Sequence, residues 1–119
     1  METTKALVWM LRAPSASGGK IYVTLVIEDH VMYAWGREDK GLGGLQYKYQ
    51  HFSSPAAAQQ GALLKTQDKE KRAYAMAIPP KVHTFTDLAP RQVLALLRGG
   101  SPMARQGLVS DAMHSGVAV

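Results

Sequence analysis

The chain contains no cysteine, and this gap excludes more chemistry than any other feature of its composition. Without a thiol there is no disulfide, no cysteine-ligated zinc or iron–sulfur cluster and no thiol nucleophile. Long hydrophobic runs are missing as well. The apolar stretch from Ala6 to Leu11 is too short to span a membrane or to form the core of a signal peptide. We therefore expect a cytoplasmic protein with no membrane contact.

Residue patterns that carry catalysis or bind metals are also scarce. The four histidines are not paired three or four residues apart, so the sequence predicts no metal site and no cofactor. The segment Gly41–Gly44 lacks the lysine and the following helix of a phosphate-binding loop, and a turn between strands explains it better. The carboxylate pairs Glu28-Asp29 and Glu38-Asp39 are sequence neighbours, which rarely face each other as an acid–base pair. We expect a protein that is not an enzyme.

What is present is a basic, moderately hydrophobic chain of 119 residues with a formal net charge of +5. This length suits one domain with a small appendage. A basic balance favours nucleic acid or acidic partners through long-range attraction. Small basic proteins that never bind nucleic acid are nevertheless common, so the charge alone does not decide the partner.

The stretch Val31–Arg37 has the strict alternation of a β-strand, and it organises the rest of the chain. Trp35 and Arg37 share one face of this strand, with the side-chain-free Gly36 between them. The pair offers a flat ring for stacking beside a planar cation that can fork onto a phosphate. A glycine-rich segment follows directly, which suits a binding site at the end of a strand.

These residues resemble the signature of the WGR domain. The tripeptide 35–37 is preceded by Tyr33 and followed by a glycine-rich turn, and Phe52 is followed six residues later by Ala58 near a helix start. Further positions that match the family's basic run and closing tyrosine are Lys69, Lys71, Arg72 and Tyr74. The likeness covers roughly residues 4 to 78, about two thirds of the chain.

Three departures from the family pattern stand out. Glu38 and Asp39 replace a small apolar residue and a glycine, the loop to the next strand is a few residues longer, and Ala73 replaces the glycine before Tyr74. The resemblance implies that the tryptophan packs on the sugar of a nucleotide at a DNA end, as in the poly(ADP-ribose) polymerases, with the arginine nearby. The two acidic residues weaken the case for phosphate binding at this arginine.

The predicted fold is α+β. We expect a twisted antiparallel sheet of four to five strands with one packed helix, plus a short helical C-terminal segment. The expected elements are strands over 6–12, 20–27, 31–37 and 45–51, a helix over 55–72, a short strand over 74–78, and helices over 88–98 and from 102 onward. The alternation of the fourth strand predicts a sheet with one wet face. Pro79-Pro80 divides the chain into a WGR-like domain, 1–78, and a helical extension, 79–119.

The candidate DNA contacts are Trp35, Arg37, Lys40, Lys48 and Arg12. Each has a plainer alternative. Trp35 can equally belong to the core, Arg37 can serve as an ion-pair partner for the acidic residues that follow it, and the other three are cations of a kind that is usually only solvated.

The sequence therefore predicts a non-catalytic module that binds the backbone or ends of DNA through Trp35 and Arg37. Affinity would come mainly from phosphate neutralisation and would fall with salt. The alternative is a protein–protein interaction module that uses the same surface. The acidic loop Glu38-Asp39 would then suit a basic partner.

Overall fold

A computed structural model of the protein describes residues 2–14, 18–86 and 88–114. Its elements in chain order are β1 (Thr3–Ala13), β2 (Lys20–Ile27), β3 (His30–Arg37), the 3-10 turns η1 (Glu38–Lys40) and η2 (Leu42–Gly44), β4 (Gln46–His51), α1 (Pro55–Glu70), β5 (Ala75–Thr86), α2 (Pro90–Gly99) and α3 (Pro102–His114). This confirms the predicted α+β fold. Among the described residues, no helix has the length and apolar character needed to cross a membrane.

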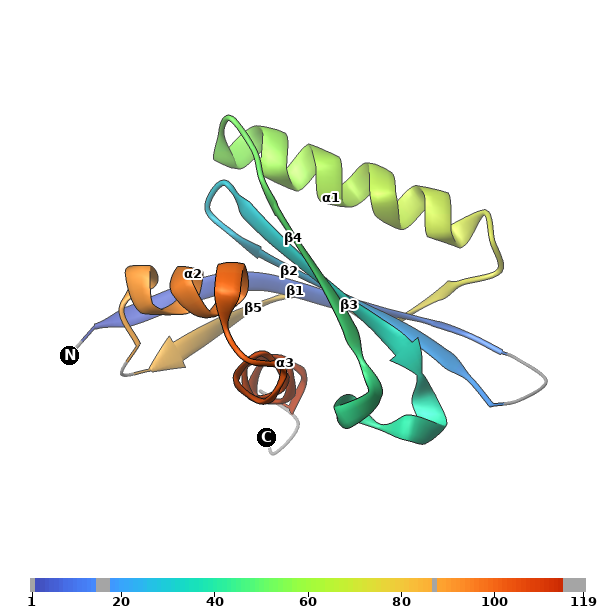
Figure 1. The fold of residues 1–119 in the computed structure, drawn as a ribbon. Helices are drawn as coiled ribbons and strands as arrows, with labels where there is room; N and C mark the ends of the chain where they lie inside the picture. The colour runs from blue at the N-terminus through green and yellow to red at the C-terminus, as the bar shows by residue number, and fades with distance from the viewer. Residues whose placement is uncertain (1, 15–17, 87, 115–119) are drawn as a thin grey trace.

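The strands form one antiparallel sheet in the order β4-β3-β2-β1-β5. Consecutive strands from β1 to β4 pair as hairpins, and β5 returns along the free side of β1 (Figure 1). The helix α1 crosses one face of the sheet, whereas α2 and α3 cover the other (Figure 1). The sheet is therefore buried on both sides along its central strands.

Alternation along β3 shows why two cores form. Val31 and Tyr33 are buried on the α1 side, in a cluster that also contains Trp9, Tyr22 and Ala62. The residues between them in β3 face the opposite cluster, under α2 and α3. The predicted wet face is thus wrong for the central strands, because a second helical layer covers it. The edge strand β4, by contrast, has no buried residue and keeps the exposed polar side chains of Gln46, Lys48 and Gln50.

The helix α1 begins as its sequence predicts. Ser54 accepts a hydrogen bond from the Ala57 amide (3.1 Å) through its side chain, and Pro55 occupies the first turn. The buried stripe is small, so the helix lies close to the sheet, and Thr66 accepts a 2.8 Å hydrogen bond from the indole nitrogen of Trp9. The helix ends at Glu70, two residues before the predicted end at Arg72.

The edge strand β5 runs unbroken from Ala75 to Thr86, through Pro79-Pro80. The sequence pattern predicts two short extended pieces here, 74–78 and 83–86, rather than one strand. A single strand is possible because the prolines fall at a register shift of the β1–β5 ladder, between the pairs Val8–Lys81 and Met10–Ile78. Edge strands tolerate proline at such irregularities, where no ladder hydrogen bond needs its missing N–H. The division into 1–78 and 79–119 stays a prediction, but residues from both sides of it, such as Ala34 and Leu97, share one core.

The C-terminal helices lie close to their predicted positions. The sequence offers Thr86 or Asp87 as the N-terminal cap of this helix, because their side-chain oxygens can accept from free amides. The cap residue of α2 is instead Ala89, and Asp87 lies outside the described residues. Arg105 of α3 donates to the carbonyl oxygens of Leu96 (3.3 Å) and Leu97 (2.9 Å), which satisfies the free end of α2. Met103, in the first turn of α3, is 81% exposed.

Candidate nucleic-acid interface

Trp35 lies near the end of β3, half-buried at the margin of the α1-side core. Its ring stacks on that of Tyr22, with the centroids 6.0 Å apart and the planes 20° from parallel. The predicted shared face of Val31, Tyr33 and Trp35 is present, and burial decreases toward the strand end. Trp35 therefore combines the two roles considered from the sequence, because one part packs on the core while another remains accessible.

The neighbouring Gly36 allows the chain to fold back beside the tryptophan. A Cβ atom at Gly36 would lie 3.0 Å from the carbonyl oxygen of Gly44 and 3.2 Å from Cδ2 of Leu45. A larger side chain would push this return segment away from β3. The close approach places the turn after β3 against the strand and builds one wall of a hollow.

That hollow has a volume of ≈ 310 Å³ and brings together three of the predicted contacts, Trp35, Arg37 and Lys40. Lys20 and Tyr74 also line it, although neither is among the predicted contacts. Lys20 is opposite Arg37 in the β2–β3 ladder, so only the strand register reveals its position. Tyr74 arrives from the segment between α1 and β5.

A second hollow of ≈ 430 Å³ lies between α1 and β4, and it contains Lys48, another predicted contact. Tyr33 and Phe52 contribute aromatic surface to it, and Lys65 and Asp68 of α1 line its rim. Its other lining residues are Gln50, Gly61 and Leu64.

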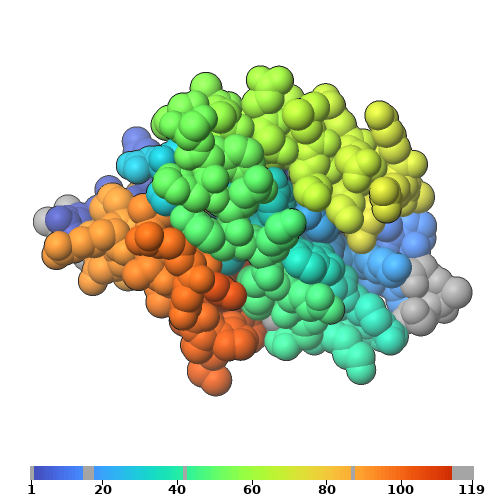
Figure 2. All heavy atoms as spheres, turned by 45° about the horizontal axis from the view of Figure 1, so that its top comes forward, coloured from blue at the N-terminus to red at the C-terminus, as the bar shows by residue number. Residues whose placement is uncertain are grey.

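The two hollows are neighbours on the α1 side of the sheet. Tyr33 is opposite Lys48 in the β3–β4 ladder, and Trp35 is opposite Gln46 in the same ladder. We call the two hollows together the α1–β4 groove. Figure 2 looks onto this side of the molecule, with the green of β4 beside the yellow-green of α1. The groove combines aromatic surface with lysines from four separate segments.

Both predicted arginines contact carboxylates. Arg37 forks onto Asp39 through Nε (3.1 Å) and Nη2 (2.7 Å). Arg12 pairs with Glu38, at 2.9 Å between Nε and Oε1. Arg12 lines a different hollow beside β5, so it does not join the other predicted contacts. The acidic loop thus partly neutralises this end of the sheet, and the lysines carry most of the positive charge in the groove.

Lys69 of α1 is half-buried and packs on the aromatic cluster beside the groove. Its ammonium nitrogen is 4.9 Å from the ring centroid of Tyr22, within the range of a cation–π contact. Partial burial lowers the pKa of Lys69, and nearby Lys65 and Arg72 add to this effect. Burial also raises the pKa of Tyr22, and the charges of Tyr33, Tyr74 and Asp68 raise it further. Lys69, the first residue of the predicted basic run, therefore makes a structural contact with the aromatic cluster.

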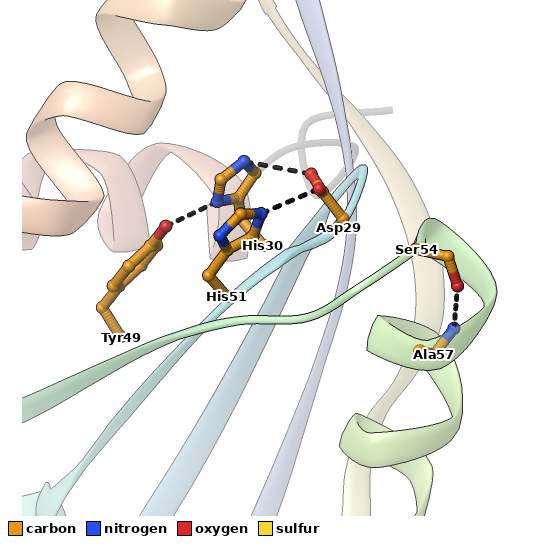
Figure 3. Close-up of polar contacts among 6 residues, drawn as sticks. All are labelled: Asp29, His30, Tyr49, His51, Ser54 and Ala57. Atoms are coloured by element: carbon orange, nitrogen blue, oxygen red, sulfur yellow. Dashed lines mark hydrogen bonds and ion pairs between the residues drawn. The ribbon is translucent and has the colours of Figure 1, made fainter.

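A second cluster of polar side chains lies at the opposite end of β3 (Figure 3). Asp29 contacts Nε2 of His30 through Oδ1 (3.0 Å) and Nε2 of His51 through Oδ2 (2.8 Å). Nδ1 of His30 lies 2.6 Å from the hydroxyl of Tyr49. The contact with His51 lowers the pKa of Asp29, and burial lowers that of His30. Helical ligand spacing in the sequence does not reveal this group, because His30 and His51 come together as partners across the β3–β4 ladder.

No model of a known protein family matches this chain, and comparisons with the curated proteins and with the solved structures find no match either.

Proposed function

We propose that this protein is a non-catalytic DNA-binding module that contacts the backbone or ends of DNA through the α1–β4 groove. The observation that carries the proposal is the half-buried indole of Trp35 in a hollow lined by Lys20 and Lys40, beside a second hollow lined by Lys48 and Lys65. Accessible aromatic rings beside rows of lysine are typical of surfaces that bind a nucleic-acid strand. The resemblance to the WGR signature favours the same function.

The proposed roles follow from the contacts of each side chain. Trp35 offers the outer part of its ring to a sugar or an unpaired base, while its inner part stays stacked on Tyr22. The lysines neutralise phosphates, which positions DNA without reading its sequence. The guanidinium of Arg37 binds a phosphate by replacing its two hydrogen bonds to the Asp39 carboxylate with two hydrogen bonds to phosphate oxygens. The lysines therefore take a larger share of binding than the predicted Trp35–Arg37 pair alone would.

One observation favours the alternative, a protein-interaction module that uses the same surface. Leu64 of α1 lines the groove and is 57% exposed, and the adjacent Leu63 is 53% exposed. Exposed leucines beside an aromatic hollow suit an apolar side chain of a protein partner. DNA offers little to match them, apart from base faces and methyl groups.

The test is fluorescence anisotropy with labelled blunt, nicked and single-stranded DNA at low and moderate salt. We expect binding at low salt that weakens linearly on a log–log plot of affinity against salt. Lys48→Gln should lower the magnitude of that slope by about 1, as the loss of one phosphate contact does. Lys5→Gln is the matched control, since Lys5 is an exposed lysine of β1 that does not line the groove.

Trp35 is tested by Trp35→Ala, with Trp35→Phe as the variant that keeps a ring on Tyr22. Circular dichroism and thermal unfolding first establish that each variant is folded. The proposal expects the alanine variant to lose about 1–3 kcal/mol of binding and the phenylalanine variant to lose less. Absence of DNA binding by the wild-type protein at low salt refutes the proposal and leaves the protein-interaction alternative.

A further inference from the structure

The cluster at the β2–β3 turn presents three potential metal ligands of the kind that zinc prefers. Among the described residues, Asp29, His30 and His51 form a group whose ligand atoms all lie within 4.8 Å of one another. Both histidines direct Nε2 toward the same carboxylate, one on each oxygen (Figure 3). Two imidazole nitrogens and a carboxylate form a recurrent ligand set for zinc and related divalent transition metals.

From this arrangement we infer that Asp29, His30 and His51 bind a divalent transition-metal ion of the zinc class. The separations of 3.0 Å and 2.8 Å between nitrogen and oxygen atoms compare with about 3.3 Å between neighbouring ligands around a tetrahedral ion with bonds of about 2.0 Å. The two nitrogens contact different oxygens of Asp29, so admitting the ion requires the His51 ring to turn toward it. Three protein ligands leave a fourth position for water or for another small ligand.

The elements that carry the ligands favour a preformed site. His30 is 8% exposed and is fixed at the first position of β3. The turn that carries Asp29 is tied to the segment after β4 by a 2.8 Å hydrogen bond from the Phe52 amide to the Asp29 carbonyl oxygen. His51 is exposed, so its ring can turn from its parallel stack on His30, where the centroids are 4.4 Å apart, toward a shared ion.

Tyr49 acts as a positioning residue for His30. Its hydroxyl lies 2.6 Å from Nδ1, and the two rings stack with centroids 5.7 Å apart. When Nε2 of a neutral imidazole binds a metal, Nδ1 carries the proton, and the tyrosine oxygen can accept it. At His30 this step releases no proton, because the neutral imidazole moves its proton from Nε2 to Nδ1 while the Tyr49 hydroxyl reverses its direction. Outer partners of this kind orient the ring and strengthen the ligand.

The arrangement also differs from a simple charge pair. His83 and Asp111 form such a pair elsewhere, at 3.0 Å, with one imidazole and one carboxylate. At the β2–β3 turn a second imidazole is added, and one carboxylate bridges both rings. Two stacked imidazolium cations would repel each other, whereas one divalent ion satisfies all three groups. A bound ion would link the β2–β3 turn to the end of β4.

The site is independent of the proposed DNA-binding function. His30 begins β3 and Trp35 lies near its other end, five residues along the strand, or roughly 17 Å at 3.3 Å per residue. Metal binding can therefore be measured without DNA, and its failure would say nothing about the groove.

The test is isothermal titration calorimetry of the whole chain with Zn²⁺, together with visible absorption of the Co²⁺ form. We expect one ion per chain, a tetrahedral Co²⁺ spectrum and a melting temperature that rises with Zn²⁺ concentration. His51→Gln and Asp29→Asn should each weaken binding at least about tenfold, and Tyr49→Phe about tenfold. Asp111→Asn, which alters the single-imidazole pair, is the matched control and should bind as the wild type does.

Three outcomes overturn the inference. They are absence of Zn²⁺ binding, binding that His51→Gln leaves unchanged, and equal weakening in His51→Gln and Asp111→Asn. Nitrogen chemical shifts of the imidazoles provide a second readout that does not depend on stability. Zn²⁺ should move Nε2 of His30 and His51 and leave both nitrogens of His83 in place.

Discussion

Arg37 and Asp39 form a two-pronged ion pair at the mouth of the groove, with Nε–Oδ1 and Nη2–Oδ2 distances of 3.1 Å and 2.7 Å. Both side chains are 45% exposed, so solvent screens the pair and it contributes little to stability. Its main consequence is electrostatic, because it places a negative charge where the proposed function requires a phosphate.

Asp39→Asn should therefore strengthen DNA binding. The substitution removes one negative charge from the mouth of the groove and releases the guanidinium fork for a phosphate. We expect an affinity gain of several-fold at low salt and a steeper salt dependence, measured by anisotropy. Glu2→Gln makes the same change in net charge at the start of β1, far from the groove, and should have a much smaller effect. Equal gains in both variants would indicate that only net charge matters.

Ala73 and Tyr74 form the C-terminal cap of α1, and an alanine occupies the cap position whose backbone has a positive φ. Ala73 has φ = 72°, and the Tyr74 amide donates to the carbonyl oxygen of Lys69 at 3.3 Å. This is the Schellman arrangement, in which the residue with positive φ is usually glycine. The WGR pattern has glycine here, and the backbone of this chain adopts a conformation that glycine prefers.

Ala73→Gly should raise the free energy of unfolding by about 1 kcal/mol, because it removes the steric penalty of a side chain at positive φ. Urea denaturation measures the change. Ala95→Gly, at an exposed position inside α2, makes the same chemical substitution where φ is helical and should lower stability by about 1 kcal/mol. Two changes of the same sign would show that the conformation at residue 73 does not govern the effect.

Local signals account for the parts of the fold that the sequence predicted well. The β2 bounds, Lys20–Ile27, follow from a run of β-branched and aromatic residues, and the α1 start at Pro55 follows from the Ser54 cap. Both signals act within a few residues. The covered second face and the continuous β5 strand could not be predicted in this way. They depend on which distant segment packs on the sheet, and no local pattern encodes that choice.

The same limit applies to the sites. Trp35 and Arg37 could be identified as neighbours because they lie on one strand. Lys20, Lys48 and Tyr74 reach the groove from other segments, so their positions depend on the ladder register and on the turn after α1. Whether Arg37 contacts solvent or the adjacent acidic residues was open, and the fork onto Asp39 shows that a local ion pair forms.

Gly61 and Phe52 show how a helix glycine can stabilise this fold. A Cβ atom at Gly61 would collide with the ring of Phe52. Gly61→Ala should gain about 1 kcal/mol in helix propensity but lose about 1–3 kcal/mol through overpacking, so we expect net destabilisation. In a Phe52→Leu background the collision is relieved, and the same substitution should become neutral or stabilising. Chemical denaturation of the four proteins gives the coupling energy, and additive effects would rule out this contact as the cause.

Three tyrosines of the α1-side cluster, Tyr22, Tyr33 and Tyr74, predict a loss of stability at alkaline pH. Burial raises the pKa of each hydroxyl above its ordinary value of 10.0. The folded protein thus keeps protons that the unfolded chain releases. The stabilisation is fully present below pH 10 and is lost as the pH rises through the raised folded-state values.

The measurement is urea unfolding at a series of pH values between about 9 and 11, with tyrosinate absorbance recorded on the folded protein. Tyr22→Phe removes one titrating group and should make the alkaline loss shallower by up to about 1.4 kcal/mol per pH unit. Its ring keeps the stack on Trp35, so the fold near neutral pH should persist. If wild type and variant lose stability in parallel, or if Tyr22 ionises with its ordinary pKa in the folded protein, the hydroxyl is more accessible than the packing around it indicates.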